Sequence, residues 1–254
     1  MEKRFLKIYD SQSTYESNWE SEMNLKHVVL LNDTKEIVFN GAKGEDEPSE
    51  PSSSYEYVDL GLPSGTLWAK CNIGAEAEED YGFYFAWGST VGATQEEVEN
   101  GTFTFGTGGN AVAYVDPTAP AEAMFTKYNS TDGLTELEPQ DDAATVHMGA
   151  EWKLPSKEQL EELTANTTSE WTTINGVNGR KFTSKVNGNY IFVPAASGAH
   201  DYGMGGVESN GDVWSSSVHS SYSSTAWYLF FHSSNVDVNN FDRMVGCSAR
   251  GVKQ

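Results

Sequence analysis

The sequence predicts a mixed α+β fold, built from a loop-rich antiparallel sheet and two short helices. Apolar runs are short and many alternate with polar residues, which is the periodicity of half-buried strands. The chain has 24 Gly against 8 Pro and is rich in Ser, a composition typical of many tight turns. Two segments of the larger domain are predicted to start helices. Hydrophobic residues make up 38% of the chain, enough for a sizeable core.

The composition divides the chain into a small unit, a linker and a larger domain. Residues 1–43 read as a small N-terminal β unit, with strands at 5–9, 27–31 and 36–40, of which the last two form a hairpin. A unit of this size is not stable alone, so we expect it to pack on a partner or on its oligomer mates. Residues 44–54 hold two Pro, four Ser and no large apolar residue, which is typical of an acidic linker.

The first part of the larger domain, 55–254, predicts strands followed by an irregular excursion. Residues 55–62 and 66–69 read as strands around a turn at Pro63-Ser64-Gly65. Residues 81–88 are densely aromatic and predict core. Residues 91–140 are rich in Gly, Thr and Pro and predict irregular structure with a short strand at 127–129. A long loop of this kind is uncommon unless it is functional.

Two helices are predicted after the excursion. The first covers 141–148, with Asp141 and Asp142 at the end that the helix dipole makes favourable for acids. The second begins with a capping box from Ser156 to Gln159 and ends near residue 166.

Strands are predicted over the rest of the domain. Residues 179–186 and 189–193 flank Asn187-Gly188, which predicts a two-residue type I′ hairpin turn. Further strands are expected at 213–214, 226–231 and 245–252.

The charge balance excludes some partners. The chain has 16 Lys+Arg and 37 Asp+Glu, a formal net charge of −21, which disfavours nucleic acid and anionic membrane surfaces as partners. No stretch approaches the roughly 20 apolar residues of a membrane span. Basic residues near the start are not followed by the apolar region of a signal peptide, so we expect cytoplasmic synthesis without export by that route. Cys71 and Cys247 are compatible with a disulfide or with two separate thiols.

No pattern in the sequence predicts a specific catalytic, cofactor or metal site. The five His lack zinc-type spacing. Ser215-Ser216-Ser217 lacks the Gly-x-Ser-x-Gly elbow of a serine hydrolase. A hydrolytic enzyme using Asp141, His147 or His200 is the least favoured hypothesis, and it requires these side chains to converge.

The C-terminal stretch 213–245 has the composition of a binding surface. It holds nine Ser together with Tyr, Trp, His and Asn, a palette in which aromatic rings give rigid contact area and small polar groups give adaptable hydrogen bonds. The composition fits a plain Ser-rich surface hairpin equally well.

Several blocks resemble one known family. Asp59-Leu-Gly-Leu-Pro-Ser-Gly-Thr-Leu-Trp-Ala-Lys-Cys-Asn-Ile-Gly-Ala75, Tyr81-Gly-Phe-Tyr-Phe-Ala-Trp-Gly88, Trp152-Lys-Leu-Pro-Ser-Lys-Glu-Gln-Leu160 and Arg243-Met-Val-Gly-Cys-Ser-Ala-Arg250 are similar to domains of the Fibrobacter succinogenes major paralogous type. This resemblance implies a C-type-lectin-like (formylglycine-generating-enzyme-like) fold over 55–254. The calcium-binding Glu-Pro-Asn and Trp-Asn-Asp motifs of sugar-binding lectins are absent, so calcium-dependent sugar binding is not implied.

A narrower resemblance concerns the C-terminal variable region, about 213–250. Its Trp-Ser-Ser…Arg-x-x-Gly…Arg pattern resembles variable proteins of diversity-generating retroelements, in which a fixed frame surrounds diversified positions. The implied frame is Trp214, Ser215, Ser216, Leu229, Val236, Arg243, Gly246 and Arg250. The implied ligand-binding positions are His219, Ser221, Tyr222, Ser224, Trp227, Phe230, His232, Ser234, Asn235, Asp237, Asn239, Phe241, Asp242 and Met244. Trp227 and Met244 depart from the adenine-derived codon pattern of such positions.

Residues 28–40 resemble a segment of structural proteins of Bacteroides phages. The resemblance implies a virion tail or fibre protein that binds a bacterial surface protein or glycan, with residues 1–43 serving virion docking or oligomerisation. We expect a homo-oligomer, such as a trimer, because avidity compensates for modest affinity per site. The alternative is a non-diversified carbohydrate- or protein-binding module of a Bacteroidetes protein.

Overall fold

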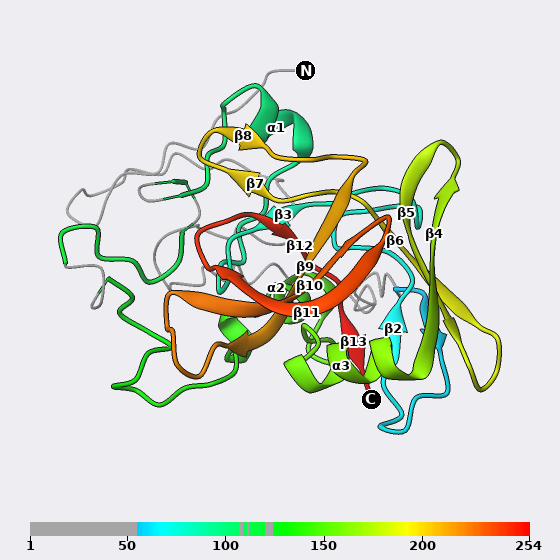
Figure 1. Ribbon diagram of the computed structural model, residues 1–254. Helices are drawn as coiled ribbons and strands as arrows, with labels where there is room; N and C mark the ends of the chain where they lie inside the picture. Colours follow the sequence, from blue (N-terminus) through cyan, green and yellow to red (C-terminus); the bar gives the residue numbers. More distant parts are fainter. Residues whose placement is uncertain (1–54, 107–108, 111, 120–123) are drawn as a thin grey trace, which may run out of the picture. The chain divides into compact units, whose positions relative to one another are not determined.

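The computed structural model describes residues 55–106, 109–110, 112–119 and 124–254 (Figure 1). These residues belong to one compact unit. The strands expected at 5–9, 27–31 and 36–40, and the linker at 44–54, lie outside the described residues.

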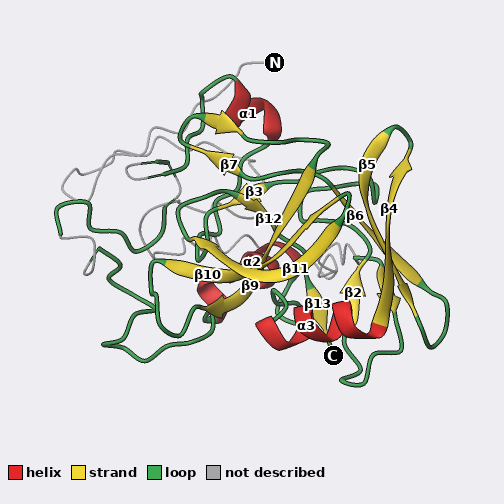
Figure 2. Cartoon of the chain, viewed as in Figure 1, coloured by secondary structure: helices red, strands yellow, loops and turns green. Residues whose placement is uncertain are grey.

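The described chain is mixed α+β, as the sequence predicts, and short antiparallel strands dominate it (Figure 2). One three-stranded sheet has the order β1-β2-β13, with strands Tyr57–Asp59, Leu67–Ala69 and Val252–Lys253. Another has the order β4-β5-β6, with strands Thr167–Ile174, Val177–Ser184 and Tyr190–Pro194. A two-stranded sheet pairs β7 (Ala199–His200) with β8 (Gly203–Met204).

A five-stranded sheet of order β11-β10-β9-β12-β3 forms the centre of the domain (Figure 1). Its strands are β9 (Asn210–Val218), β10 (Thr225–His232), β11 (Asn235–Asp242), β12 (Cys247–Ser248) and β3 (Tyr84–Phe85). Helix α3 (Lys157–Asn166) contacts β9, β10 and β11. Its Leu160 and Leu163 share one buried cluster with Leu229 and Phe231 of β10. One face of these three strands is therefore core.

The aromatic segment 81–88 is core, which confirms the prediction. Tyr84, Phe85 and Trp87 are each at most 1% exposed. The indole of Trp87 donates a hydrogen bond to the carbonyl of Ser215 (2.7 Å), and that of Trp214 donates to the carbonyl of Phe85 (2.7 Å). Both buried indoles are therefore satisfied, and the two pairs join the first half of the domain to its C-terminal sheet.

The two expected helices are present, and one boundary differs. The capping box of Ser156 and Gln159 starts α3, as predicted. Helix α2 covers Ala143–Met148, because the Asp142 carboxylate accepts hydrogen bonds from the amides of Ala144 and Thr145 and is the N-cap. Asp141 belongs instead to a preceding 3-10 helix, η2 (Pro139–Asp141).

The excursion at 91–140 contains structure that the sequence analysis missed. Helix α1 (Gln95–Glu99) starts with a capping box between Thr94 and Glu97, a local signal that was present in the sequence. The expected strand at 127–129 is wrong. Tyr128 has a φ of 58°, and the Asp132 carboxylate accepts hydrogen bonds from the amides of Tyr128 and Asn129, which makes this segment a turn.

Two strand predictions also need correction. The type I′ turn at Asn187-Gly188 is wrong, because β5 and β6 are joined by residues 185–189. The hydroxyl of Ser184 accepts from the amides of Val186 and Asn187, and the Asn187 side chain donates to the carbonyl of Asp59. These bonds hold a wider loop. In place of one strand at 245–252 the chain forms β12 and β13.

Both cysteines are free thiols. Cys71 is half-buried and Cys247 is buried, and burial raises the pKa of each thiol. Over the part of the chain that the structure describes, no helix has the length and apolar character that crossing a membrane requires.

Candidate ligand-binding face

The second face of β9, β10 and β11 carries a row of aromatic side chains. Residues directly opposite each other in an antiparallel ladder point to the same face. Tyr228 lies opposite Trp214 and Asn239, and Phe230 lies opposite Asp212 and Asp237. These side chains therefore share the face away from Leu229 and Phe231.

The row continues from ring to ring across three elements. The centroid distances are 4.8 Å for Tyr202–His200, 5.9 Å for His200–Phe241, 5.0 Å for Phe241–Tyr228, 6.1 Å for Tyr228–Phe230 and 5.6 Å for Phe230–His232. We call these six residues, with the exposed Asp237 and Asn239 between them, the aromatic face. The buried Trp214 (1% exposed) contacts Tyr228 and Phe241 on the same face, so these two rings pack against core.

A buried carboxyl group lies on the same face as the row, opposite Phe230. Asp212 is 4% exposed, and its Oδ2 accepts one hydrogen bond, from the amide of Asn210 at 2.9 Å. Burial raises the pKa of Asp212 to about 7. The group therefore changes charge near neutral pH.

A small recess of about 200 Å³ opens beside the aromatic face. It is lined by Gly106, His200, Asp201, Asp242, Met244 and Val245. Burial lowers the pKa of His200, against the opposing effect of Asp201 and Asp242, so the imidazole is neutral at pH 7.

The turn between β9 and β10 carries a second aromatic group. The ring of His219 stacks on Tyr222 (5.1 Å) and on Trp227 (4.8 Å), and Lys157 Nζ lies 4.7 Å from the centroid of Trp227. His219 Nδ1 accepts hydrogen bonds from the amides of Ser221 and Tyr222. This loop cluster is separate from the aromatic face, because Trp227 alternates with Tyr228 along β10.

The structure thus distributes the expected ligand-binding positions over two surfaces and the turns between them. The aromatic face holds Phe230, His232, Asp237, Asn239 and Phe241, and the loop cluster region holds His219, Ser221, Tyr222, Ser224 and Trp227. Ser234 and Asn235 lie where β10 turns into β11, and Asp242 and Met244 line the recess. All of these positions are at least partly exposed.

Three aromatic residues of the face were missed by the sequence analysis as site residues. Tyr228 alternates with Phe230 along one strand, and that period of two was a usable signal. From the sequence, His200 is named only as a catalytic candidate. Tyr202, which is 77% exposed, comes from the β7–β8 turn, and only the folded chain shows that it belongs to the row.

The frame residues Trp214, Ser215, Ser216, Leu229, Arg243, Gly246 and Arg250 are all buried, and Val236 is partly buried. The hydroxyl of Ser215 donates to the carbonyl of Trp227 (2.7 Å). Ser216 and its neighbour Ser217 each donate to one oxygen of the Glu136 carboxylate (2.5 Å). The Ser run therefore fixes the excursion to β9, which is a structural role.

The two frame arginines connect distant segments. The guanidinium of Arg243 lies 4.6 Å from the ring centroid of Trp87 and 4.3 Å from that of Phe125, and Nη1 donates to the carbonyls of Lys127, Tyr128 and Ser223. The fully buried Arg250 donates from Nε to Asn72 Oδ1 (2.9 Å) and from Nη1 to the carbonyl of Phe192 (2.8 Å). Burial lowers the pKa of both arginines to about 10, so both stay charged at neutral pH.

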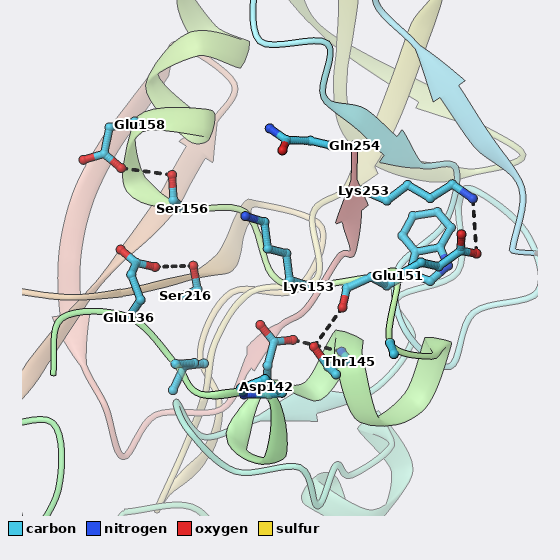
Figure 3. A pocket seen from close by; sticks show the side chains of 14 residues that line it. Glu136, Asp142, Thr145, Glu151, Lys153, Ser156, Glu158, Ser216, Lys253 and Gln254 are labelled. Carbon is cyan, nitrogen blue, oxygen red and sulfur yellow. Dashed lines mark hydrogen bonds and ion pairs between the residues drawn. The ribbon is translucent and has the colours of Figure 1, made fainter.

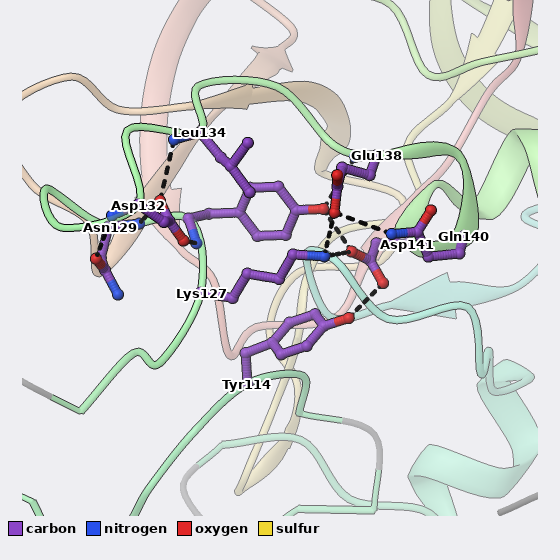
Figure 4. A network of polar contacts seen from close by, with 9 residues as sticks. Tyr114, Lys127, Asn129, Asp132, Leu134, Glu138, Gln140 and Asp141 are labelled. Atoms are coloured by element: carbon purple, nitrogen blue, oxygen red, sulfur yellow. Dashed lines mark hydrogen bonds and ion pairs between the residues drawn. The ribbon is translucent and has the colours of Figure 1, made fainter. Parts of the chain in front are cut away.

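A polar network orders the excursion where it meets Asp141 (Figure 4). The Asp141 carboxylate accepts from Lys127 Nζ (2.6 Å) and from the hydroxyls of Tyr114 and Tyr128 (both 2.5 Å). Lys127 also pairs with Glu138. Burial alone would raise the pKa of Asp141, but the bonds from Lys127 and the two tyrosines lower it below the ordinary value.

A larger hollow of about 720 Å³ lies near the C-terminus (Figure 3). Several of its carboxylates already serve neighbouring groups: Glu136 accepts from Ser216, Glu158 from Ser156, and Glu151 pairs with Lys253 at 3.3 Å. Asp142 caps α2. These lining groups therefore have structural roles, and the hollow is a weaker candidate than the aromatic face.

The residues considered for a hydrolytic enzyme have separate partners. Asp141 bonds to Lys127, His147 Nε2 lies 2.8 Å from the carbonyl of Thr90, and His200 stacks on Tyr202. Over the described ranges, no hydrogen bond, ion pair or ring contact joins any two of Asp141, His147 and His200. The same ranges contain no group of three or more His, Cys, Asp or Glu placed to hold a metal ion.

Comparison of the chain with protein-family models, with curated proteins and with solved structures gives no match. Inferences about function therefore rest on the residues and geometry described above.

Proposed function

We propose that this protein is a ligand-binding protein rather than an enzyme, and that it recognises a bacterial surface protein or glycan through its C-terminal face. One observation carries the proposal: the residues of the Trp-Ser-Ser…Arg-x-x-Gly…Arg frame other than Val236 are buried, while the expected ligand-binding positions between them are all at least partly exposed. These positions include Phe230 and Phe241, whose rings contact the buried Tyr228. The proposed fold is C-type-lectin-like.

The lectin-like fold is supported by where the resembling blocks lie. Trp68, Trp87 and Trp152, one from each of three of these blocks, are all 1% exposed. Each of the three blocks therefore contributes a large ring to the core, which is the role expected of residues that specify a fold rather than a ligand.

The arrangement suits a face whose side chains change while its backbone stays fixed. The backbones of β9, β10 and β11 are held by ladder hydrogen bonds, and α3 covers their other face. Substitution at an exposed position such as Asp237 or Asn239 changes what the face contacts without removing core. We propose that retroelement-directed variation uses this separation, in a virion tail or fibre protein that gains avidity as a homo-oligomer.

A matched pair of variants tests the use of the face. Asn239→Arg places a bulky charged side chain on the aromatic face, and Val186→Arg adds the same charge at a position that is 72% exposed in the loop between β5 and β6. Fluorescently labelled protein is incubated with a panel of Bacteroidetes cells, and bound fluorescence is measured. We expect wild type and Val186→Arg to label the same strains and Asn239→Arg to lose labelling. Equal labelling by Asn239→Arg would contradict the proposal.

A further inference from the structure

The aromatic face and its recess carry negative charge that no ion pair among the described residues neutralises. Asp201 lies in the β7–β8 turn, and Asp237 and Asp242 lie on β11. The ion pairs found among the described residues involve Lys70, Lys127, Lys157 and Lys253, and none of these reaches the three aspartates. His200 is the third titratable residue that lines the recess or lies beside it, and its imidazole is neutral at pH 7 because burial lowers its pKa.

The recess is kept open by a glycine. Gly106 has a φ of 89°, and a Cβ added there would lie 2.9 Å from the Cβ of Asp201. Its amide donates to the carbonyl of Met244 at 3.0 Å, which fixes the loop against the segment that joins β11 to β12. A side chain at this position would meet Asp201 and occupy space beside it, so glycine leaves the two carboxylates accessible around the hollow of about 200 Å³.

The ring of His200 lines the same hollow, and two further rings contact it. The His200 ring is parallel to that of Tyr202 within 4° and meets Phe241 edge-on at 5.9 Å. Two carboxylates beside aromatic rings are the surroundings that a guanidinium or an ammonium group prefers, since the group pairs with the acids and stacks on the rings. A neutral sugar would gain the stacking and hydrogen bonds but not the charge complementarity.

We propose that the recess between Asp201 and Asp242 receives an arginine or lysine side chain of a protein ligand. This inference rests on the proposed function and deepens it, because it assigns the ligand to a protein with a basic surface rather than to a neutral glycan. The net charge of −21 favours the approach of such a surface. Asp201, His200 and Gly106 lie outside the expected variable stretch, whereas Asp242 and Met244 are expected variable positions, so Asp201 is the carboxylate of the recess that persists when the variable positions change.

The direct test uses a cationic probe and its neutral isostere. N-acetyl-arginine amide and N-acetyl-citrulline amide are titrated at millimolar concentration into the isotopically labelled full chain, and backbone amide signals are followed by NMR. We expect the arginine probe to shift the signals of residues 200–202 and 242–245 and the citrulline probe to leave them unchanged. Equal shifts by both probes, or none with arginine, would overturn the proposal.

Variants separate the recess from the general attraction of an acidic protein. Asp201→Asn removes one charge from the recess, and Glu170→Gln removes one from an exposed position on β4. We expect Asp201→Asn to weaken arginine binding about ten-fold, the order of one charge-assisted pair, and Glu170→Gln to leave it unchanged. Equal weakening by both variants would mean unspecific charge attraction and would overturn the proposal.

The cell-labelling assay distinguishes this proposal from the proposed function. Loss of labelling with both Asp201→Asn and Asn239→Arg, and after protease treatment of the cells, supports a basic protein ligand. Loss with Asn239→Arg alone leaves the face as a binding site but overturns the basic side chain in the recess. Labelling that survives protease and is lost after periodate oxidation identifies a glycan and overturns the proposal as well. Labelling that neither variant changes contradicts the proposed function itself.

Discussion

The two faces of strands β9, β10 and β11 differ in how deeply they bury alternate residues of the same strand. Leu229 and Phe231 point toward α3 and are at most 1% exposed, whereas Phe230 between them points to the aromatic face and is partly exposed. Strand geometry alone separates these neighbours, since successive side chains point to opposite faces. The separation lets one stretch of sequence serve as core and as a contact surface.

The comparison is sharpest at two adjacent phenylalanines. Phe231→Ala removes a fully buried ring, and we expect the free energy of unfolding to fall by about 3–5 kcal/mol. Phe230→Ala removes a ring that rests on the surface of the sheet, and we expect a loss of about 1 kcal/mol. Urea unfolding followed by tryptophan fluorescence measures both. Similar losses for the two variants would contradict the assignment of the faces.

The buried carboxyl group of Asp212, opposite Phe230, gives a pH-dependent test. The pKa of Asp212 is raised from 3.8 to about 7 in the folded chain, so the folded state holds a proton that the unfolded chain releases between these values. The contribution of Asp212 to stability therefore falls as pH rises through this window, by up to about 4 kcal/mol, and is constant above it.

Asp212→Asn removes this contribution while its amide oxygen can still accept from Asn210. We expect the variant to gain stability relative to wild type as pH rises from 4 to 8, with the two most similar at the acid end. Unfolding curves at several pH values give the difference directly, because the other carboxylates are common to both proteins. A difference that does not change with pH would contradict a raised pKa.

A smaller effect is expected at the frame glycine. A Cβ at Gly246 would lie 2.5 Å from the ring of Phe105, which is buried with 1% exposed. Gly246→Ala therefore forces the ring or the backbone to shift, at a cost of about 1–3 kcal/mol. Gly188→Ala is the comparison variant. A Cβ at Gly188 meets no atom within 4 Å, so any loss of stability in this variant comes from the backbone φ of 78° and not from a steric clash. Thermal unfolding that leaves Gly246→Ala as stable as wild type would show that this site relaxes.

Asn239→Arg is expected to have the smallest effect on stability and a large effect on ligand binding. Asn239 is exposed opposite Tyr228, so Asn239→Arg should change the free energy of unfolding by less than about 0.5 kcal/mol. Thermal unfolding beside the cell-labelling assay compares the two effects. A strongly destabilised Asn239→Arg would mean that this position serves the core rather than a ligand.

Local sequence patterns predicted the structure correctly where contacts between neighbouring residues determine it. The capping box at Ser156 predicted the start of α3, and the aromatic density of 81–88 predicted core. The Asn187-Gly188 turn was wrong because distant groups, such as the carbonyl of Asp59, hold a wider loop. No local pattern indicates such a partner.

The candidate face was only partly predictable for the same reason. Phe230 and Phe241 lie in the stretch whose composition suggested binding, but Tyr202 joins the row through the β7–β8 turn. Trp227 and Phe230 lie on different surfaces of the domain. This could not be read from the sequence alone, because the pairing and packing of β10 decide which of its side chains face α3.

Sequencing of the coding locus and its flanks from several isolates would show whether the protein has a diversified face on a fixed core. We expect an adenine-rich near-copy of the final codons, substitutions at exposed positions such as Asp237 and Asn239, and unchanged Trp214, Gly246 and Arg250. An invariant C-terminus with no template repeat nearby would contradict diversification and would favour a non-diversified carbohydrate- or protein-binding module of a Bacteroidetes protein.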